Sequence, residues 1–167
     1  MNKNIISAIG NTKQRMTLGN TTSLEIFRIM KTSLQNLISV VLGSEQGALA
    51  VYNSGRAVGG EMYEAFFKEI KEFDELIEQF SKLVKDLKIG IVSVIKADFE
   101  KGFFEIRVDE CVSCSGTSNT GKSICDFEGG IIAGVLQAYL GKRVEAKETH
   151  CWGLGDNFCG FEVHVTA

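Results

Sequence analysis

The chain has 167 residues, of which 44% are hydrophobic and 23% charged, and its formal net charge is -3 at pH 7. These values are typical of one globular domain and exclude a strongly basic surface for nucleic acid. The apolar runs are far shorter than the roughly 18 residues of a membrane span, and the N-terminus shows no signal-peptide pattern. We therefore expect a cytoplasmic protein, in which five cysteines favour metal or redox chemistry over structural disulfides.

The N-terminal part of the chain is predicted to form a loose polar arm followed by a helix. Residues 1–20 are rich in Gly, Ser, Thr and Asn, and we expect residues 21–167 to form a single domain. Thr22 or Ser23 can cap the helix, whose apolar side chains recur at steps of three and four. Gly43 is a natural point for this helix to end.

Further helices are expected before the first strand. Residues 47–60 are compatible with a short helix or with a turn-rich link, and a helix over about 60–70 follows. The clearest helix lies between Phe73 and Leu87, where apolar residues form one stripe and charged residues occupy the opposite face.

After this helix the apolar period changes to two, which indicates β-strands. Phe104, Ile106 and Val108 alternate with charged residues, and Gly102 supports a hairpin with the preceding strand. In chain order, the expected segments are strands 89–97 and 103–110, a loop over 111–123, a helix over 124–140, and strands 143–149 and 158–165. This order predicts an α+β fold with an antiparallel sheet of about four strands backed by helices.

Four residues in the last third of the chain have the spacing of a metal site. Cys125 opens the predicted helix, and Glu148, Cys151 and Cys159 follow within the final hairpin. Strand parity points Glu148 and Cys159 inward, where an unpaired carboxylate is costly and a cation removes that cost. Three thiolates and one carboxylate fit a closed zinc site, which is structural because no position stays open for catalysis. The alternatives are buried free cysteines, or His150 as a replacement ligand.

Two motifs in the loop before this helix carry weaker signals. Residues 116–123, GTSNTGKS, match the phosphate-binding pattern G-x-x-x-x-G-K-[ST] of nucleotide hydrolases. We reject this interpretation because the preceding strand is amphipathic and no apolar strand ending in Asp follows to hold magnesium. Cys111 and Cys114 form a CxxC without a thioredoxin-like setting. We interpret them as uncommitted thiols, with a second metal contribution as the alternative.

The stretch from Cys125 to Val165 contains a cysteine before a Gly-rich helix, then E-x2-C, a G-D turn and C-x-F. These features fall on Cys125, Gly130, Gly134, Glu148, Cys151, Gly155, Asp156, Cys159 and Phe161. In this pattern the chain resembles the C-terminal half of the 4-vinyl reductase domain family. The helical N-terminal part agrees in general layout, with Gly55 and Gly59 in a G-x-x-x-G.

The resemblance implies a fold similar to that of vesicle-transport-particle subunits, with an antiparallel sheet, backing helices and an apolar cavity. It also implies zinc on Cys125, Glu148, Cys151 and Cys159, and a homodimer formed through helices. Similar domains sense phenols and alkylbenzenes in bacterial activators, and a further relative belongs to bacteriochlorophyll synthesis. This chain shows no AAA+ or DNA-binding segment, so we expect a stand-alone sensor or carrier.

The leading functional hypothesis is a non-enzymatic binding module for a small apolar, aromatic or tetrapyrrole molecule. Its pocket is expected between the inner face of the sheet and the helix over 124–140. The predicted lining is Phe104, Ile106, Phe127, Ile131, Val135, Val144 and Ala146, each of which can equally be a core residue. The alternatives are a protein-interaction module and an enzyme, either vinyl reductase-like or a P-loop nucleotide hydrolase. A reductase needs a hydride source, and no dinucleotide fingerprint follows a strand.

Overall fold

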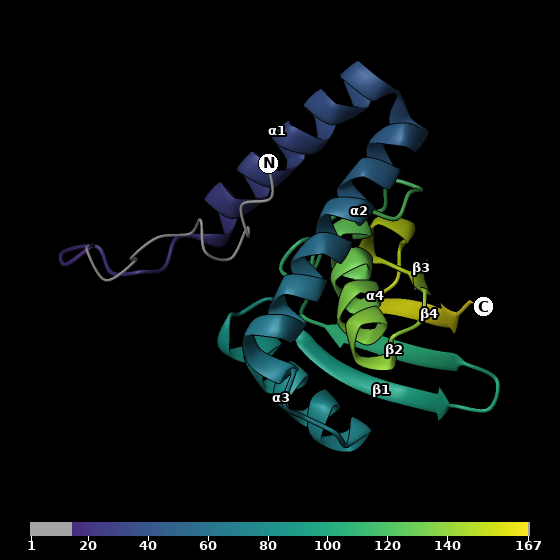
Figure 1. The fold of residues 1–167 in the computed structure, drawn as a ribbon. Coiled ribbons are helices and arrows are strands. Elements are labelled where there is room, and N and C mark those ends of the chain that lie inside the picture. Colours follow the sequence, from purple (N-terminus) through teal and green to yellow (C-terminus); the bar gives the residue numbers. More distant parts are fainter. Residues whose placement is uncertain (1–14, 167) are drawn as a thin grey trace.

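Four antiparallel strands form a single sheet in the spatial order β1-β2-β4-β3. The computed structural model describes residues 15–166, and Figure 1 shows their arrangement. The strands are β1 (Ile91–Asp98), β2 (Phe103–Asp109), β3 (Val144–His150) and β4 (Cys159–Val165). The helices are α1 (Leu24–Leu42), α2 (Ser44–Met62), a π-helical turn (Tyr63–Phe67), α3 (Phe73–Asp86), α4 (Asp126–Leu140) and a 3-10 turn (Trp152–Leu154). The predicted α+β fold is confirmed.

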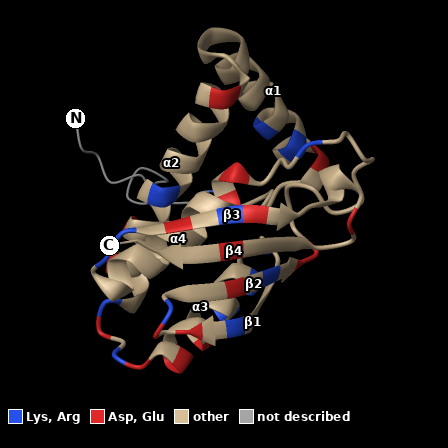
Figure 2. Ribbon diagram, turned by 90° about the vertical axis from the view of Figure 1, so that its right-hand side faces the viewer, with Lys and Arg blue, Asp and Glu red and all other residues tan. Residues whose placement is uncertain are grey.

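The alternation of apolar and charged residues decides which face of the sheet is buried. Phe104 and Ile106 of β2 are buried and lie opposite Val163 and Phe161 of β4 in the antiparallel register. The other face carries acidic and basic residues of both signs, which Figure 2 shows along the strands. The period-two pattern that predicts β2 therefore also identifies correctly the face that packs against the helices.

Two helices stack over the buried face, α4 against the sheet and α2 against α4 (Figure 1). Their backbones are in contact, because a Cβ added to Gly55 or Gly59 would overlap a carbonyl oxygen of α4. In the same way, a Cβ added to Gly130 or Gly134 would overlap a carbonyl oxygen of α2. The close approach predicted from the glycines of α4 is confirmed, and its partner is α2.

Residues 44–67 differ from the sequence prediction. One helix, α2, continues from Ser44 to Met62 and passes directly into the π-helical turn, without the separate helix expected from about residue 60. Glycines lower the helix propensity of this segment, and its contact with α4 overrides that local preference. The sequence periodicity of α2 alone contains no sign of this contact.

Helix α1 begins and ends where the sequence predicts. The Ser23 hydroxyl accepts a hydrogen bond from the Ile26 N–H, and Gly43, with φ of 83°, ends the helix. α1 then extends away from the sheet (Figure 1), and none of its residues is buried. Residues 1–14 of the predicted arm lie outside the described residues. Within residues 15–166, no helix combines the length and the apolar character that crossing a bilayer requires.

The glycine contact between α2 and α4 predicts a large difference between two neighbouring substitutions. Gly59→Ala places a methyl group against the carbonyl oxygen of Ile131 and should lower the free energy of unfolding by about 1–3 kcal/mol. Gly60→Ala, on the same helix, meets no atom within 4 Å and should raise it by up to about 1 kcal/mol. Urea denaturation measures both. Equal effects of the two substitutions contradict the packing described here.

Candidate metal centre

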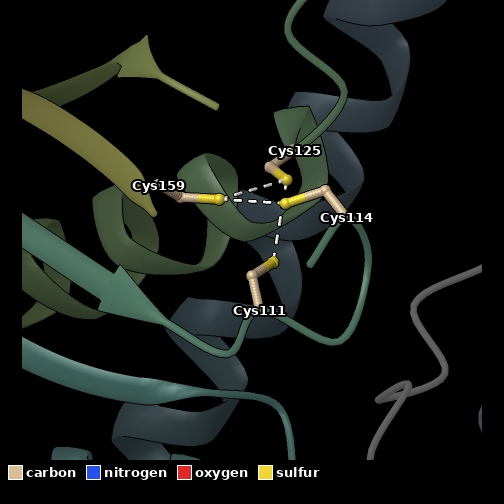
Figure 3. Close-up of side chains that lie close together, drawn as sticks. All are labelled: Cys111, Cys114, Cys125 and Cys159. Atoms are coloured by element: carbon tan, nitrogen blue, oxygen red, sulfur yellow. Dashed lines mark hydrogen bonds between the residues drawn. The ribbon is translucent and has the colours of Figure 1, made fainter. Parts of the chain in front are cut away.

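All five cysteines of the chain are free thiols and almost fully buried, each at most 1% exposed. Three segments supply them: Cys111 and Cys114 lie in the loop after β2, and Cys125 directly precedes α4. Cys151 follows β3, and Cys159 begins β4. Figure 3 shows that the sulfur atoms of four of them point toward one another. Segments far apart in the chain thus bring their thiols to one buried point.

The sulfur–sulfur distances match the edges of a tetrahedron around one metal ion. From Cys125, the distances are 3.7 Å to Cys111, 3.8 Å to Cys159 and 4.0 Å to Cys151. Zn–S bonds of about 2.3 Å in tetrahedral geometry separate two ligand sulfurs by about 3.8 Å. The distance between Cys114 and Cys159, 3.1 Å, is shorter, so this pair has to move apart when an ion binds.

Six donors fall into two overlapping sets, each with all ligand atoms within 4.8 Å of one another. The sulfur set consists of Cys111, Cys114, Cys125 and Cys159. The mixed set consists of Cys125, Glu148, Cys151 and Cys159 and is the set that the sequence predicts. Thiolates and a carboxylate are ligands that zinc accepts, so either set fits a structural zinc ion.

The carboxyl group of Glu148 is the clearest sign that a cation belongs here. Its Oε2 accepts the N–H of Cys125 at 3.0 Å, whereas its Oε1 is buried without a hydrogen-bond partner. Burial, followed by the neighbouring Cys151 thiol, raises the pKa of Glu148 to about 9. A divalent cation satisfies the unpaired oxygen and favours the ionised carboxylate, which removes both costs.

Local backbone structure holds the donors in place. Cys111 and Cys114 lie on a tight turn, in which the Cys111 carbonyl accepts the N–H of Cys114 at 3.3 Å. The carboxylate of Asp156 accepts the Cys151 N–H at 2.9 Å, and the Cys151 carbonyl accepts the Asp156 N–H at 3.1 Å. Cys125 stands at the N-terminal end of α4, where the helix dipole favours a thiolate.

The sequence does not assign Cys111 and Cys114 to the metal site, although the structure places both in the sulfur set. The signal lies in the sheet register: Val108 pairs with Cys159, so the turn that follows β2 begins beside that thiol. The sequence alone does not reveal this register. His150 is a possible ligand by sequence, but it is exposed, stacks on a phenylalanine ring and belongs to neither donor set.

The predicted ligand residues are divided between the core and a cavity. Four of them are at most 2% exposed and pack in the core, and Ala146 lies beside them. These four are Phe104, Ile106, Val135 and Val144. Phe127 and Ile131 instead line a cavity of about 560 Å³ next to the start of α1. The space nearest to the metal centre and open to a ligand therefore lies on the α1 side of α4.

The loop GTSNTGKS covers the metal-site turn and does not have the geometry of a phosphate cradle. The N–H groups of Thr120 and Lys122 both donate to the carbonyl oxygen of Gly153, at 2.8 and 3.3 Å. A phosphate-binding loop needs such groups free to face its ligand. In addition, β2 pairs only with antiparallel strands, β1 and β4, unlike the parallel sheet of P-loop proteins. The rejection of the nucleotide-binding interpretation is supported.

Solved structures share this fold. A vinyl-4-reductase family protein from Methanocaldococcus jannaschii aligns with a TM-score of 0.62 and 19% identity, covering 100% of this chain and 98% of that one. The phenol-responsive sensory domain of the transcription activator PoxR, with phenol, aligns with a TM-score of 0.65 and 14% identity, covering 99% and 92%. A trafficking protein particle complex subunit 3 from Naegleria fowleri, covalently bound to palmitic acid, aligns with a TM-score of 0.62 and 18% identity, covering 84% and 95%.

Sequence comparison adds a nearer relationship. The uncharacterized protein MJ0150 of Methanocaldococcus jannaschii is 34% identical over 163 residues, which are 98% of this chain and 87% of that protein. The profile of the vinyl-4-reductase domain matches residues 104–165, which include α4, the final hairpin and all five cysteines. The resemblance inferred from the cysteine and glycine pattern is confirmed. The chain belongs to the vinyl-4-reductase domain family.

Proposed function

We propose that this protein is a zinc-containing domain that binds a small apolar or aromatic molecule and works as a sensor or carrier. The observation that carries the proposal is an apolar cavity beneath α1, close to the metal centre. The shared fold with a phenol-responsive sensory domain and with a palmitate-bound subunit supports it. The free thiols also agree with a cytoplasmic location, where thiols stay reduced.

This cavity has a volume of about 370 Å³ and lies between α1, α2 and the start of α4. Ligand sites for small molecules typically span about 300–1,000 Å³, with apolar walls and a few polar groups. The apolar wall includes Phe27, Leu34, Ile38, Val51 and Phe127. The chemistry of this wall suits an aromatic ring or an aliphatic chain.

Glu128 gives the cavity its main polar feature. Its side chain lines the cavity although the residue is only 7% exposed. One carboxyl oxygen accepts a hydrogen bond from the hydroxyl of Ser113, and the other has no partner. Burial raises the pKa of Glu128 and favours the neutral carboxyl group. We infer that it orients a ligand hydroxyl or carboxyl group in an otherwise apolar space.

The cavity and the cysteines are linked through α1. Arg28 donates to the carbonyl oxygen of Val112 at 2.8 Å, between Cys111 and Cys114. Lys31, which also lines the cavity, donates to the carbonyl oxygen of Ile124 at 2.8 Å, directly before Cys125. A ligand that moves α1 therefore acts on both ends of the loop that carries three of the thiols, which is how a sensor could transmit binding.

Ligand binding is tested with a thermal-shift screen of phenols, fatty acids and porphyrins. A ligand at roughly 100 times its dissociation constant should stabilise the fold by about 2.7 kcal/mol. Ala50→Phe fills the cavity and should abolish this stabilisation, whereas Leu49→Phe, at an exposed site on the same helix, should leave it intact. A screen without any stabilising compound favours a protein-interaction module instead.

Phe104→Trp distinguishes this cavity from the pocket predicted between the sheet and α4. Because Phe104 is 1% exposed and packed, the larger ring should destabilise the protein by about 1–3 kcal/mol without changing ligand affinity. Loss of binding in a normally folded Phe104→Trp variant places the ligand against the sheet.

The proposed zinc ion is structural, because protein ligands fill its coordination in either donor set. When bound, it joins the loop after β2, the start of α4 and the final hairpin. Apparent binding free energies of structural zinc are about 10–16 kcal/mol, so the hairpin should depend on it. With no open coordination position, we assign the centre no catalytic role.

Removal of the metal predicts a matched pair of effects. The wild-type protein should contain zinc by metal analysis and should lose several degrees of melting temperature when a strong chelator is added. Cys159→Ser removes a ligand that belongs to both donor sets, so this variant should lack zinc and should not respond to chelator. Wild-type protein purified without zinc, and insensitive to chelator, contradicts the proposal.

We further propose that the protein forms a homodimer through α1. The helix is apolar but buries none of its residues, with Val40 83% and Ile29 61% exposed. Exposed apolar surface of this extent is typical of an interaction site. A second copy of the same helix offers a complementary apolar face, and α1 is free of the sheet to reach it (Figure 1).

Light scattering during gel filtration tests the dimer. The wild type should elute as a dimer, and the double variant Ile29→Glu/Val40→Glu should be monomeric, because charged side chains resist burial in an apolar interface. Leu87→Glu is the control, since Leu87 is also exposed, at 56%, but lies outside α1. A monomeric wild type rules out this interface.

A further inference from the structure

The cysteine cluster contains more donors than one zinc ion can use. Zinc in a structural site takes four ligands, and the two overlapping sets offer six. An ion in the sulfur set leaves Glu148 and Cys151 buried beside it without a metal. An ion in the mixed set leaves Cys111 and Cys114, both at most 1% exposed. Neither single-ion arrangement explains why all six groups converge.

The two donor sets share one edge. Cys125 and Cys159 belong to both, and their sulfurs are 3.8 Å apart, the tetrahedral edge length that Zn–S bonds require. A thiolate sulfur has enough lone pairs to bind two ions at once, so an edge shared by two tetrahedra is a pair of bridging thiolates. Building on the zinc centre proposed above, we propose that this protein binds two zinc ions, bridged by the thiolates of Cys125 and Cys159.

Each ion is completed by donors from a different segment. Cys111 and Cys114, on the turn after β2, complete the first site, and Glu148 and Cys151, at the end of β3, complete the second. The six donors form two sets instead of one, as two ions require. The Glu148 oxygen that lacks a hydrogen-bond partner is then a ligand of the second ion.

The balance of charge favours the second ion. One ion in the sulfur set already carries four thiolates, an excess of two negative charges. A second ion adds two positive charges, which balance the carboxylate of Glu148 and the thiolate of Cys151 as both become ligands. The pair of ions thus uses all six groups in their charged forms without adding net charge to a buried site.

The distances also distinguish this centre from an iron–sulfur cluster. Such a cluster places several irons and inorganic sulfides between its cysteines and therefore holds most of them farther apart. Here Cys125 lies within 4.0 Å of three other sulfurs, which leaves room for ions that share ligands and not for an inorganic core. The geometry therefore points to zinc ions.

Metal analysis of the purified full chain and of matched variants tests the proposal. The wild type should contain about two zinc ions per chain. Cys111→Ser/Cys114→Ser and Glu148→Gln/Cys151→Ser should each retain about one, because each leaves one complete set and the bridging pair. Cys125→Ser should lose both. Val112→Ala, in the CxxC turn but without a donor, should keep the wild-type content.

Cadmium-113 NMR of the metal-exchanged wild type keeps the test independent of whether the variants fold. Two resonances, coupled to each other through the shared thiolates, are expected: one for an all-sulfur site and one shifted by its oxygen ligand. One zinc per chain with a single resonance overturns the second ion and leaves the structural zinc and the ligand cavity in place. Iron and sulfide in equal amounts, with visible absorption, overturn it in favour of a cluster. Absence of any metal overturns both proposals.

Discussion

The structure depends on the convergence of five thiols and one carboxyl group on a single buried point. The donors arrive from the loop after β2, from the start of α4 and from both strands of the final hairpin, which no other local interaction among the described residues joins so tightly. Without a cation, this point holds a carboxyl group with an unpaired oxygen among closely packed sulfurs. Such a group is expensive to bury, so the cation that compensates it also fixes the segments relative to one another.

Helix α4 connects this centre with the rest of the molecule. Cys125 at its start reaches the metal site, and Phe127 and Glu128, within the next turn, line the cavity beneath α1. One turn later, Gly130 and Gly134 hold α2 in backbone contact. A displacement at the cavity therefore has a short physical route to the metal ligands, through the first turn of one rigid helix. The hydrogen bonds of Arg28 and Lys31 provide a second route from α1.

Much of the fold could be predicted because local patterns determine it. The alternation in β2, the apolar stripe of α3 and the stop at Gly43 are recognisable in the sequence and are confirmed. The extent of α2 is not, because its glycines are typical of a break, and only the contact with α4 explains them. That contact joins residues about 75 positions apart, and pattern reasoning on one segment has no access to such a distance.

The candidate site shows the same division. Strand parity and the spacing of Cys125, Glu148, Cys151 and Cys159 predict one of the two donor sets. The CxxC turn could not be assigned because its place depends on the register between β2 and β4. The cavity depends on where α1 lies, whereas parity alone points to the sheet, where side chains such as Ile106 and Val135 fill the space.

X-ray absorption at the zinc edge is the most direct measurement of the central claim, that the cysteine cluster is a metal centre. The purified protein should show a first shell dominated by sulfur at about 2.3 Å, with a minor oxygen contribution at about 2.0–2.2 Å from Glu148. A second heavy scatterer a short distance beyond that shell is expected from the neighbouring ion. A first shell of nitrogen and oxygen alone would show that the metal lies elsewhere and would contradict the account.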